Sequence, residues 1–318
     1  MPWLPTPREP LLRVAVTGGT HGNEMSGVYL ARHWLQCPEE LRRPSFSAIP
    51  ILANPEASAA CSRYVGQDLN RSFTSAVLTS RATSNDPYEV TRARELNQWL
   101  GPKASGQAFD FILDLHNTTA NMRACILANS DCCAFAMHMC HYLQLQNPEL
   151  PCHVIHYQSG ETFSLQSVAK MGLSLELGPQ PQGVLQADIF SQMRALVASS
   201  LDFIELFNQG TGFPAFEMEV YRHCGEEDFP RTEAGDLAGI VHPQLQDQDF
   251  EPLQPGAPIF QLFSGEEVLY QGDRTVYPMF INEAAYYEKH MAFMKTEKTS
   301  ILVPALPPLP AAAPIQTP

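Results

Sequence analysis

The chain has 318 residues, a formal net charge of −14 at pH 7 and 44% hydrophobic residues. A chain of this length can form one large domain, or a large domain with a smaller one, and we expect the second. The acidic balance argues against nucleic acid and anionic membranes as partners, because a polyanion needs a basic binding surface. No apolar run approaches the length of a membrane span, so we expect no transmembrane segment.

Eight cysteines are spread along the chain without regular spacing, and no C-x-x-C pair occurs. A structural zinc cluster is therefore not expected. The N-terminus lacks a basic segment followed by an apolar one, so we predict no secretory signal, reduced thiols and a cytoplasmic protein. Whether the protein associates peripherally with a membrane stays open.

Strand-like and helix-like patterns alternate over residues 12–209, after an irregular, proline-rich N-terminus at 1–11. This alternation predicts a sheet with helices on both faces. The charged residues Arg92, Arg94 and Glu95 of one expected helix are interpreted as solvated. We expect strands near 12–17, 46–52, 109–115, 123–127, 152–157 and 172–178, and helices near 25–35, 88–100, 131–145 and 184–208.

The pattern changes at residue 210, where short β-like runs separated by Pro-Gly and Gly-Asp turns begin. These runs predict a smaller β-rich C-terminal domain over residues 210–300. Residues 301–318 form a Pro- and Ala-rich tail that we expect to be extended or without regular structure. The runs lie at 216–220, 239–241, 259–263 and 268–270.

A candidate metal site comes from residues at the ends of two expected strands. His21 and Glu24 follow the first strand at H-x-x-E spacing, and His116 follows the strand at 109–115. Ligands of open α/β sheets gather outside the carboxyl ends of the strands, so the three side chains can meet. Two histidines and a carboxylate form a typical catalytic zinc site, with one position open for water. An isolated H-x-x-E pair is more often a surface feature.

Two further segments supply polar groups. Residues 63–73 show neither a helical nor a strand period and contain Arg63, Asn70 and Arg71, which indicates an ordered, functional loop. Glu176 interrupts the apolar run at 172–178. A carboxylate there is paired, exposed at a strand end or placed for chemistry.

Six blocks, in order, resemble the aspartoacylase and succinylglutamate desuccinylase family of the zinc carboxypeptidase superfamily. The resemblance runs from about residue 12 to 296. It implies an α/β fold, a carboxypeptidase-like mixed sheet flanked by helices, with a smaller β-rich C-terminal domain. The blocks are 19–24 (GTHGNE), 68–71 (DLNR), 114–118 (DLHNT), 176–184 (ELGPQPQGV), 242–250 (HPQLQDQDF) and 282–288 (NEAAYYE).

The resemblance implies a zinc-dependent amidohydrolase for small N-acylated amino acids, with one Zn²⁺ per subunit. His21, Glu24 and His116 would ligate the zinc. Glu176 would be the general base, contact the substrate and later donate a proton to the leaving amine. Arg63 would face the oxyanion and contact the substrate.

The same resemblance implies a clamp for the substrate carboxylate, formed by Asn70, Arg71 and Tyr286. Arg71 suits a bidentate pair with a carboxylate. The C-terminal domain would cover the site and exclude peptides. We expect the protein to be a homo-oligomer, either a dimer or a tetramer.

One position departs from aspartoacylase. A second arginine, which pairs there with the substrate's aspartate side chain, is replaced by Gln166. Losing a buried cationic partner disfavours N-acetylaspartate. The sequence therefore fits better the neighbouring branch of the family, which deacetylates N-acetyl aromatic amino acids and mercapturates, the S-conjugates of N-acetylcysteine.

Two alternatives stay open at this point. The chain could be an aspartoacylase proper, with a strong preference for N-acetylaspartate. It could also be a catalytically idle binding protein that uses its surface or its Pro-rich tail. The intact ligand set and base disfavour the second alternative.

Overall fold

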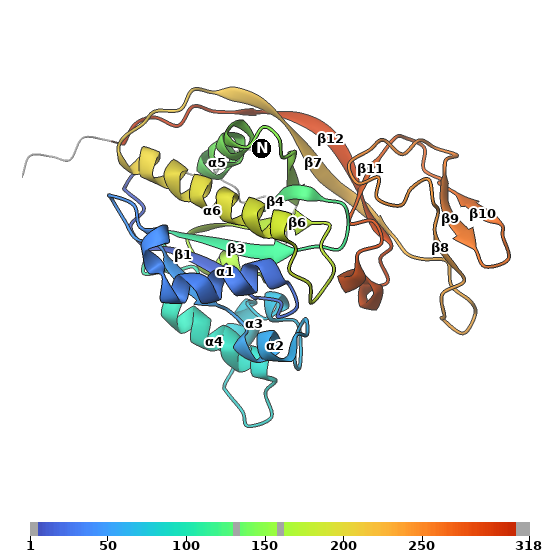
Figure 1. Ribbon diagram of the computed structural model, residues 1–318, viewed down its shortest axis with the longest axis horizontal. Coiled ribbons are helices and arrows are strands. Elements are labelled where there is room, and N and C mark those ends of the chain that lie inside the picture. The colour runs from blue at the N-terminus through green and yellow to red at the C-terminus, as the bar shows by residue number, and fades with distance from the viewer. Residues whose placement is uncertain (1–5, 130–133, 158–161, 310–318) are drawn as a thin grey trace, which may run out of the picture.

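The computed structural model describes residues 6–129, 134–157 and 162–309, and it is built around one large mixed sheet (Figure 1). Within those residues the sheet has nine strands in the order β11-β12-β7-β5-β4-β6-β3-β1-β2. A second sheet, of three strands, has the order β10-β9-β8. The mixed sheet flanked by helices, with a further β-rich C-terminal part, confirms the predicted fold class.

The strands of the large sheet are β1 (Val14–Gly18), β2 (Ile49–Leu52), β3 (Phe111–Asn117), β4 (Arg123–Asn129), β5 (Cys152–Tyr157), β6 (Met171–Gly178), β7 (Phe216–Glu227), β11 (Tyr277–Met279) and β12 (Phe293–Val303). The small sheet contains β8 (Gly239–Val241), β9 (Pro258–Leu262) and β10 (Glu267–Leu269). The α-helices are α1 (Met25–Gln36), α2 (Pro55–Ala60), α3 (Ser75–Thr79), α4 (Tyr88–Leu100), α5 (Ala134–Gln146) and α6 (Ala187–Asn208). Short 3-10 helices are η1 (Pro38–Leu41), η2 (Leu69–Arg71), η3 (Leu165–Val168) and η4 (Ala284–Lys289).

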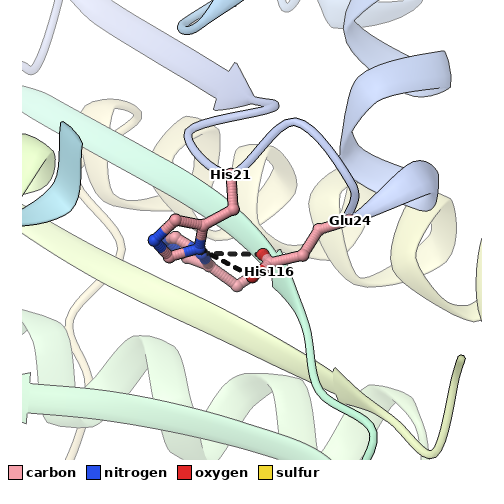
Figure 2. Close-up of side chains that lie close together, drawn as sticks. All are labelled: His21, Glu24 and His116. Carbon is pink, nitrogen blue, oxygen red and sulfur yellow. Dashed lines mark hydrogen bonds and ion pairs between the residues drawn. The ribbon is translucent and has the colours of Figure 1, made fainter. Parts of the chain in front are cut away.

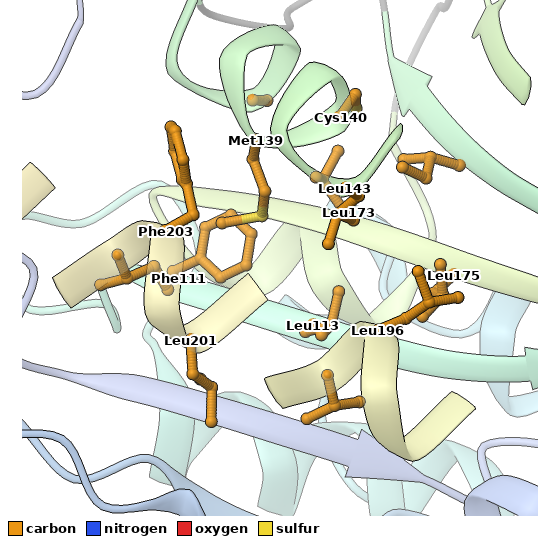
Figure 3. Packing of buried hydrophobic residues seen from close by; sticks show 14 of the residues in the cluster. Phe111, Leu113, Met139, Cys140, Leu143, Leu173, Leu175, Leu196, Leu201 and Phe203 are labelled. Carbon is orange, nitrogen blue, oxygen red and sulfur yellow. The ribbon is translucent and has the colours of Figure 1, made fainter. Parts of the chain in front are cut away.

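Helices cover both faces of the large sheet, as the alternating pattern predicts. One core cluster joins the strands to α1, α5 and α6, and a second joins the opposite face to α4. Figure 3 shows Leu113 and Leu173 of the sheet packed against Met139 of α5 and Leu196 of α6. Each buried aliphatic side chain of this kind contributes about 1.5–3 kcal/mol to folding, so the helices fix the sheet on both sides.

The strand pairing brings three strand ends to one edge. β3 lies between β1 and β6, and both pairs are parallel. The carboxyl ends of parallel neighbours lie together. The chain after β1, the end of β3 and the end of β6 are therefore neighbours, and His116 pairs in register with Glu176.

The C-terminal part shares the large sheet. β7 pairs with β5, and β12 pairs along β7 from Phe293 to Val303, so the expected boundary at residue 300 falls inside β12. Residues 304–309 have no regular secondary structure apart from a bridge between Phe213 and Leu306. The rest of the Pro-rich tail lies outside the described residues. Among the described helices, none is long and apolar enough to cross a membrane.

The charges of α4 are less solvated than expected. Arg92 Nε donates to Ala53 O at 2.8 Å, and Arg94 Nε donates to Val77 O at 3.2 Å. Only Glu95 of the three is mainly exposed, with 57% of its side chain accessible. The interpretation of the arginines as solvated was wrong, because Arg92 binds the backbone just after β2 and Arg94 binds the backbone of α3.

Candidate functional site

The turn after β1 places two of the predicted ligands. Gly19 has a φ of +70°, a conformation that side-chain-bearing residues rarely adopt. A Cβ at Gly22 would lie about 2.0 Å from the backbone of Ala57, so only glycine allows this close approach to α2. Glu24 stands at the N-cap position of α1 but makes no capping hydrogen bond with its side chain. Its carboxylate is therefore available to His21.

His21, Glu24 and His116 converge as the sequence predicts (Figure 2). Glu24 Oε1 lies 2.6 Å from His21 Nδ1, and Glu24 Oε2 lies 2.9 Å from His116 Nδ1. The two Nδ1 atoms are 3.2 Å apart. All three residues are buried. Nitrogen and carboxylate donors that meet in this way form a set that could hold a metal ion.

Each histidine has a carboxylate behind it. His21 Nε2 lies 3.0 Å from Asp68 Oδ1, and His116 Nε2 lies 2.8 Å from Asp114 Oδ2. Thr17 and Thr20 donate hydroxyl hydrogen bonds to Asp114 Oδ1 at 2.6 and 2.7 Å. A carboxylate on Nε2 fixes the tautomer that leaves Nδ1 free as a metal ligand. Asp68 and Asp114 had no predicted role, although they lie in the sequence blocks at 68–71 and 114–118.

Opposite charges shift the pKa values of Glu24 and His116 against the effect of burial. Burial alone would raise the pKa of Glu24, but His21 and His116 outweigh it and hold this pKa well below its usual range. Burial would lower the pKa of His116, but Asp114 and Glu24 raise it well above the usual value. The site therefore concentrates negative charge around the imidazoles, which favours a bound cation.

Glu176 stands beside this group, near the end of β6. Burial raises the pKa of Glu176 to about 7, His116 opposes the shift, and Glu24 adds to it. A carboxyl group with a pKa near neutrality can both accept and donate a proton at working pH. The Glu176 side chain is partly accessible to solvent and lines the cavity, so it is neither fully buried nor fully exposed at the end of β6.

A cavity of about 360 Å³ opens over His21, Glu24 and Glu176. Its polar walls include the residues predicted to bind a substrate carboxylate, which are Asn70 and Arg71 of the loop at 63–73 and Tyr286 of η4. Its apolar walls come from Leu127 and from the C-terminal segment around η4. The lining includes His21, Glu24, Arg63, Asn70, Arg71, Leu127, Phe163, Gln166, Glu176, Phe280, Glu283, Tyr286, Lys289, Met291 and Met294.

The loop at residues 63–71 reaches the cavity from one side. Arg63 donates to Glu24 Oε1 at 3.4 Å and to Asp68 Oδ2 at 3.1 Å. Asn70 uses its Oδ1 to accept from Leu165 N at 3.0 Å, which leaves its amide donors available. The Arg71 guanidinium lies 4.7 Å from the centre of the Phe163 ring. The structure thus brings the predicted site residues to the lining of one cavity, apart from His116, which lies next to that lining with its Nδ1 2.9 Å from Glu24 Oε2.

Three polar atoms of the cavity lining are buried without a hydrogen-bond partner among the described residues: Arg63 Nε, Gln166 Oε1 and Lys289 Nζ. Buried polar atoms without partners are rare in folded proteins. Lys289 directly follows the block at 282–288, and no role was predicted for it from the sequence. Burial, together with the nearby Arg71 and Arg63, lowers the pKa of Lys289 to about 8. Arg63 Nε and Lys289 Nζ favour an anionic ligand, whereas Gln166 Oε1 favours a ligand group that donates a hydrogen bond.

Glu283 ties the C-terminal segment to the strand that carries His116. Its Oε2 accepts from Thr119 N at 2.7 Å and from Ala120 N at 3.1 Å, and it also accepts from the Thr118 hydroxyl. Its Oε1 caps η4 by accepting from Ala285 N at 3.1 Å. Glu283 is almost completely buried. One carboxylate therefore holds the wall that carries Tyr286 and Lys289.

We expect Glu283→Ala to destabilise the protein by about 3 kcal/mol or more, because it leaves several buried donors unpaired. A thermal unfolding scan of the variant measures this as a lower midpoint. Exposed Glu266 in the turn between β9 and β10 is a matched control, and Glu266→Ala should leave the midpoint within about 1–2 °C. Equal midpoints for the two variants would show that the tie contributes nothing.

Family comparisons agree with the geometry. Residues 10–204 match the model of the succinylglutamate desuccinylase/aspartoacylase catalytic domain, and residues 216–298 match the AstE/AspA barrel-sandwich hybrid domain. The chain belongs to this family. The resemblance carried by the six sequence blocks is thus confirmed, and the family's two domains together span most of the chain.

Relatives within the family are similar over nearly their whole length. An N-acyl-aromatic-L-amino acid amidohydrolase (carboxylate-forming) of Homo sapiens is 73% identical over 314 residues, which cover 98% of both chains. An aspartoacylase of Mus musculus is 45% identical over 296 residues, 92% of this chain and 95% of that one. The crystal structure of murine aminoacylase 3 matches with a TM-score of 0.93 and 69% identity, covering 95% of this chain and 100% of that chain.

Proposed function

We propose that the protein is a zinc-dependent deacylase that hydrolyses the amide of N-acetyl amino acids, with preference for aromatic ones and mercapturates. The observation that carries this proposal is the convergence of His21, Glu24 and His116 beside Glu176, in a cavity with unpartnered polar atoms. The relatives named as N-acyl-aromatic-L-amino acid amidohydrolases support the substrate class.

His21, Glu24 and His116 would hold the zinc ion, one per subunit. When bound, zinc supplies a Lewis acid and lowers the pKa of water to about 7. Glu176 takes the proton from the attacking water and returns it to the leaving amine, a task suited to a pKa near neutrality. Arg63 is held facing Glu24 and stabilises the negative charge that develops on the carbonyl oxygen.

The substrate carboxylate is bound by Arg71, with donors from Asn70 and Tyr286. Burial raises the pKa of Tyr286, as does the nearby Glu176, so its hydroxyl keeps its proton and can donate. Lys289 lies 4.9 Å from the centre of the Tyr286 ring and adds positive charge to this side of the cavity. An acidic protein can thus bind a small anion with a few locally placed cations.

The preference for the substrate's side chain follows from Gln166, which stands where aspartoacylase has a second arginine. Gln166 is buried, lines the cavity and offers an amide, which does not neutralise the side-chain carboxylate of N-acetylaspartate. The apolar walls at Leu127, Phe280, Met291 and Met294 favour an aromatic or thioether side chain. Both features support N-acetyl aromatic amino acids and mercapturates.

The function is tested by kcat/KM for N-acetyl-L-tyrosine, an N-acetyl-L-cysteine S-conjugate and N-acetyl-L-aspartate. We expect the first two to exceed N-acetyl-L-aspartate by more than about 100-fold, since an unpaired buried charge costs several kcal/mol. Gln166→Arg should narrow this gap by restoring a cation. A wild-type preference for N-acetyl-L-aspartate would instead favour the aspartoacylase alternative, to which the 45% identical relative gives some support.

The proposal also covers the alternative of an idle binding protein, the domain bounds, the location in the cell and the oligomeric state. The intact site argues against a catalytically idle binding protein, and turnover of any substrate in the panel would exclude that alternative. We also propose a catalytic domain at residues 12–209 and a C-terminal domain at 210–300 that covers the site. A cytoplasmic location and a homo-oligomer complete the proposal.

A further inference from the structure

Glu89 is a buried carboxylate for which the proposed reaction has no use. It lies in the first turn of α4 and is inaccessible to solvent. Its Oε1 accepts from Val65 N at 2.6 Å and from Asn54 Nδ2 at 3.2 Å. Its Oε2 accepts from Gly66 N at 3.0 Å and from Gln67 N at 3.2 Å. A buried carboxylate is costly unless such donors satisfy it, so this one is held in a single position.

The donors to Glu89 are consecutive backbone amides in the middle of the loop that reaches the cavity. Arg63 precedes this segment and Asp68 follows it, and the two side chains pair at 3.1 Å. Val65 is 53% exposed, so the segment has little apolar packing of its own to fix it. Glu89 therefore supplies the inward attachment of an otherwise exposed stretch.

The same carboxylate also reaches the turn that carries His21. Asn54 donates to Glu89, and its backbone N–H donates to Gly19 O at 3.0 Å. Gly22 N in turn donates to Arg63 O at 3.3 Å. The turn after β1 and the loop at 63–71 are thus fixed to the N-terminus of one rigid helix. The positive end of a helix dipole stabilises a carboxylate placed there.

We propose that Glu89 is a positioning residue, which fixes the loop at 63–71 so that Asn70 and Arg71 meet the substrate carboxylate. This inference rests on the proposed function of that loop. A purely structural role would weaken the whole protein and affect all substrates equally. A positioning role affects most the substrates that possess the carboxylate, and this difference separates the two roles.

The test compares N-acetyl-L-tyrosine with N-acetyl-L-tyrosinamide, which lacks the carboxylate that Arg71 binds. Glu89→Gln keeps the shape of the side chain but places an NH₂ group against backbone donors. We expect the ratio of kcat/KM for the acid over the amide to fall at least tenfold, because a 1 Å displacement of a positioning group can cost about 100-fold. Equal losses for the two substrates would overturn the proposal.

Two further variants complete this experiment. Glu89→Asp keeps the charge on a shorter side chain, so the acid-to-amide ratio should fall less than in Glu89→Gln. If Glu89→Gln does not fold, Glu89→Asp can be used instead to compare N-acetyl-L-tyrosine with N-acetyl-L-tyrosinamide. Glu95→Gln, on the exposed side of the same helix, is the matched control and should leave the ratio unchanged. A fall as large in Glu95→Gln as in the Glu89 variants would overturn the proposal.

Hydrogen exchange tests the attachment without any substrate. In Glu89→Gln, we expect faster exchange at the amides of Val65, Gly66 and Gln67 and unchanged exchange over residues 95–100. Unchanged exchange at all three amides would overturn the role of Glu89 whatever the kinetics. Wild-type protein that fails to hydrolyse N-acetyl-L-tyrosine would contradict the proposed function, and the exchange rates would then still decide whether Glu89 fixes the loop.

Discussion

Glu176→Gln should lower kcat by about 10²–10⁴-fold while the protein keeps its zinc. The amide has the size of the carboxylate but cannot take the proton from water or return it to the leaving amine. Because Glu176 is not one of the candidate metal ligands, the substitution should leave the metal site intact. The measurements are turnover of N-acetyl-L-tyrosine and metal content of the dialysed protein.

The pH profile gives the same variant a second readout. Burial raises the pKa of Glu176 to about 7 in the absence of metal, and the positive charge of a bound divalent cation would lower it. The base acts when deprotonated. As the pH rises through the pKa of Glu176 in the zinc-bound protein, which lies below about 7, kcat/KM of the wild type should therefore rise and then level off. This acid limb should be missing from the residual activity of Glu176→Gln.

A matched control is available in the same cavity. Glu226 lines the rim, with 57% of its side chain exposed, and has no assigned role in the reaction. Glu226→Gln should therefore change kcat by no more than about twofold. Near-normal turnover in Glu176→Gln, or an equal loss in Glu226→Gln, would refute the role of Glu176 as base.

The catalytic half of the fold was predictable because each element has its own pattern. The run at 88–100 has a helical period and becomes α4, and the apolar runs at 109–115 and 172–178 become the neighbouring strands β3 and β6. Strand β12 was missed and β7 was predicted only to Val220. The centre of β12 (KTEKTS) and the second half of β7 (RHCGEE) are mostly polar, and cross-strand ion pairs such as Lys298 with Glu219 link the two strands. Such pairs cannot be recognised before the register is known.

In the candidate site, too, some residues could be predicted from local sequence and others depend on contacts made only in the folded chain. His21, Glu24 and His116 were found because their types and spacing suit a metal, and the strand order then brings them together. Glu89 and Lys289 gave no such signal, since each depends on a partner that is close only in the folded chain. A glutamate in the first turn of a helix is ordinarily a solvated residue that interacts with the helix dipole.

Substitution of a candidate metal ligand should reduce zinc affinity more than substitution of the carboxylate that binds the ligand's other nitrogen. His116→Ala removes one donor of three and should leave a protein that loses zinc on dialysis. Asp114→Asn leaves all three donors in place but puts an amide beside His116 Nε2. If that amide donates to Nε2, the proton of the ring moves to Nδ1, which can then no longer ligate. We expect a loss of zinc affinity of about 10–100-fold for Asp114→Asn.

Metal competition with a chromophoric chelator measures this series directly, and activity before and after chelation follows from the same samples. Asp110→Asn is the control, because Asp110 immediately precedes β3, at the opposite end of the strand from His116, and pairs with Lys170 at 2.8 Å. Its zinc affinity should equal that of the wild type. If His116→Ala binds zinc as tightly as Asp110→Asn, the cation is not held between the ends of β1 and β3, and the water-activating role assigned to this edge of the sheet fails with it.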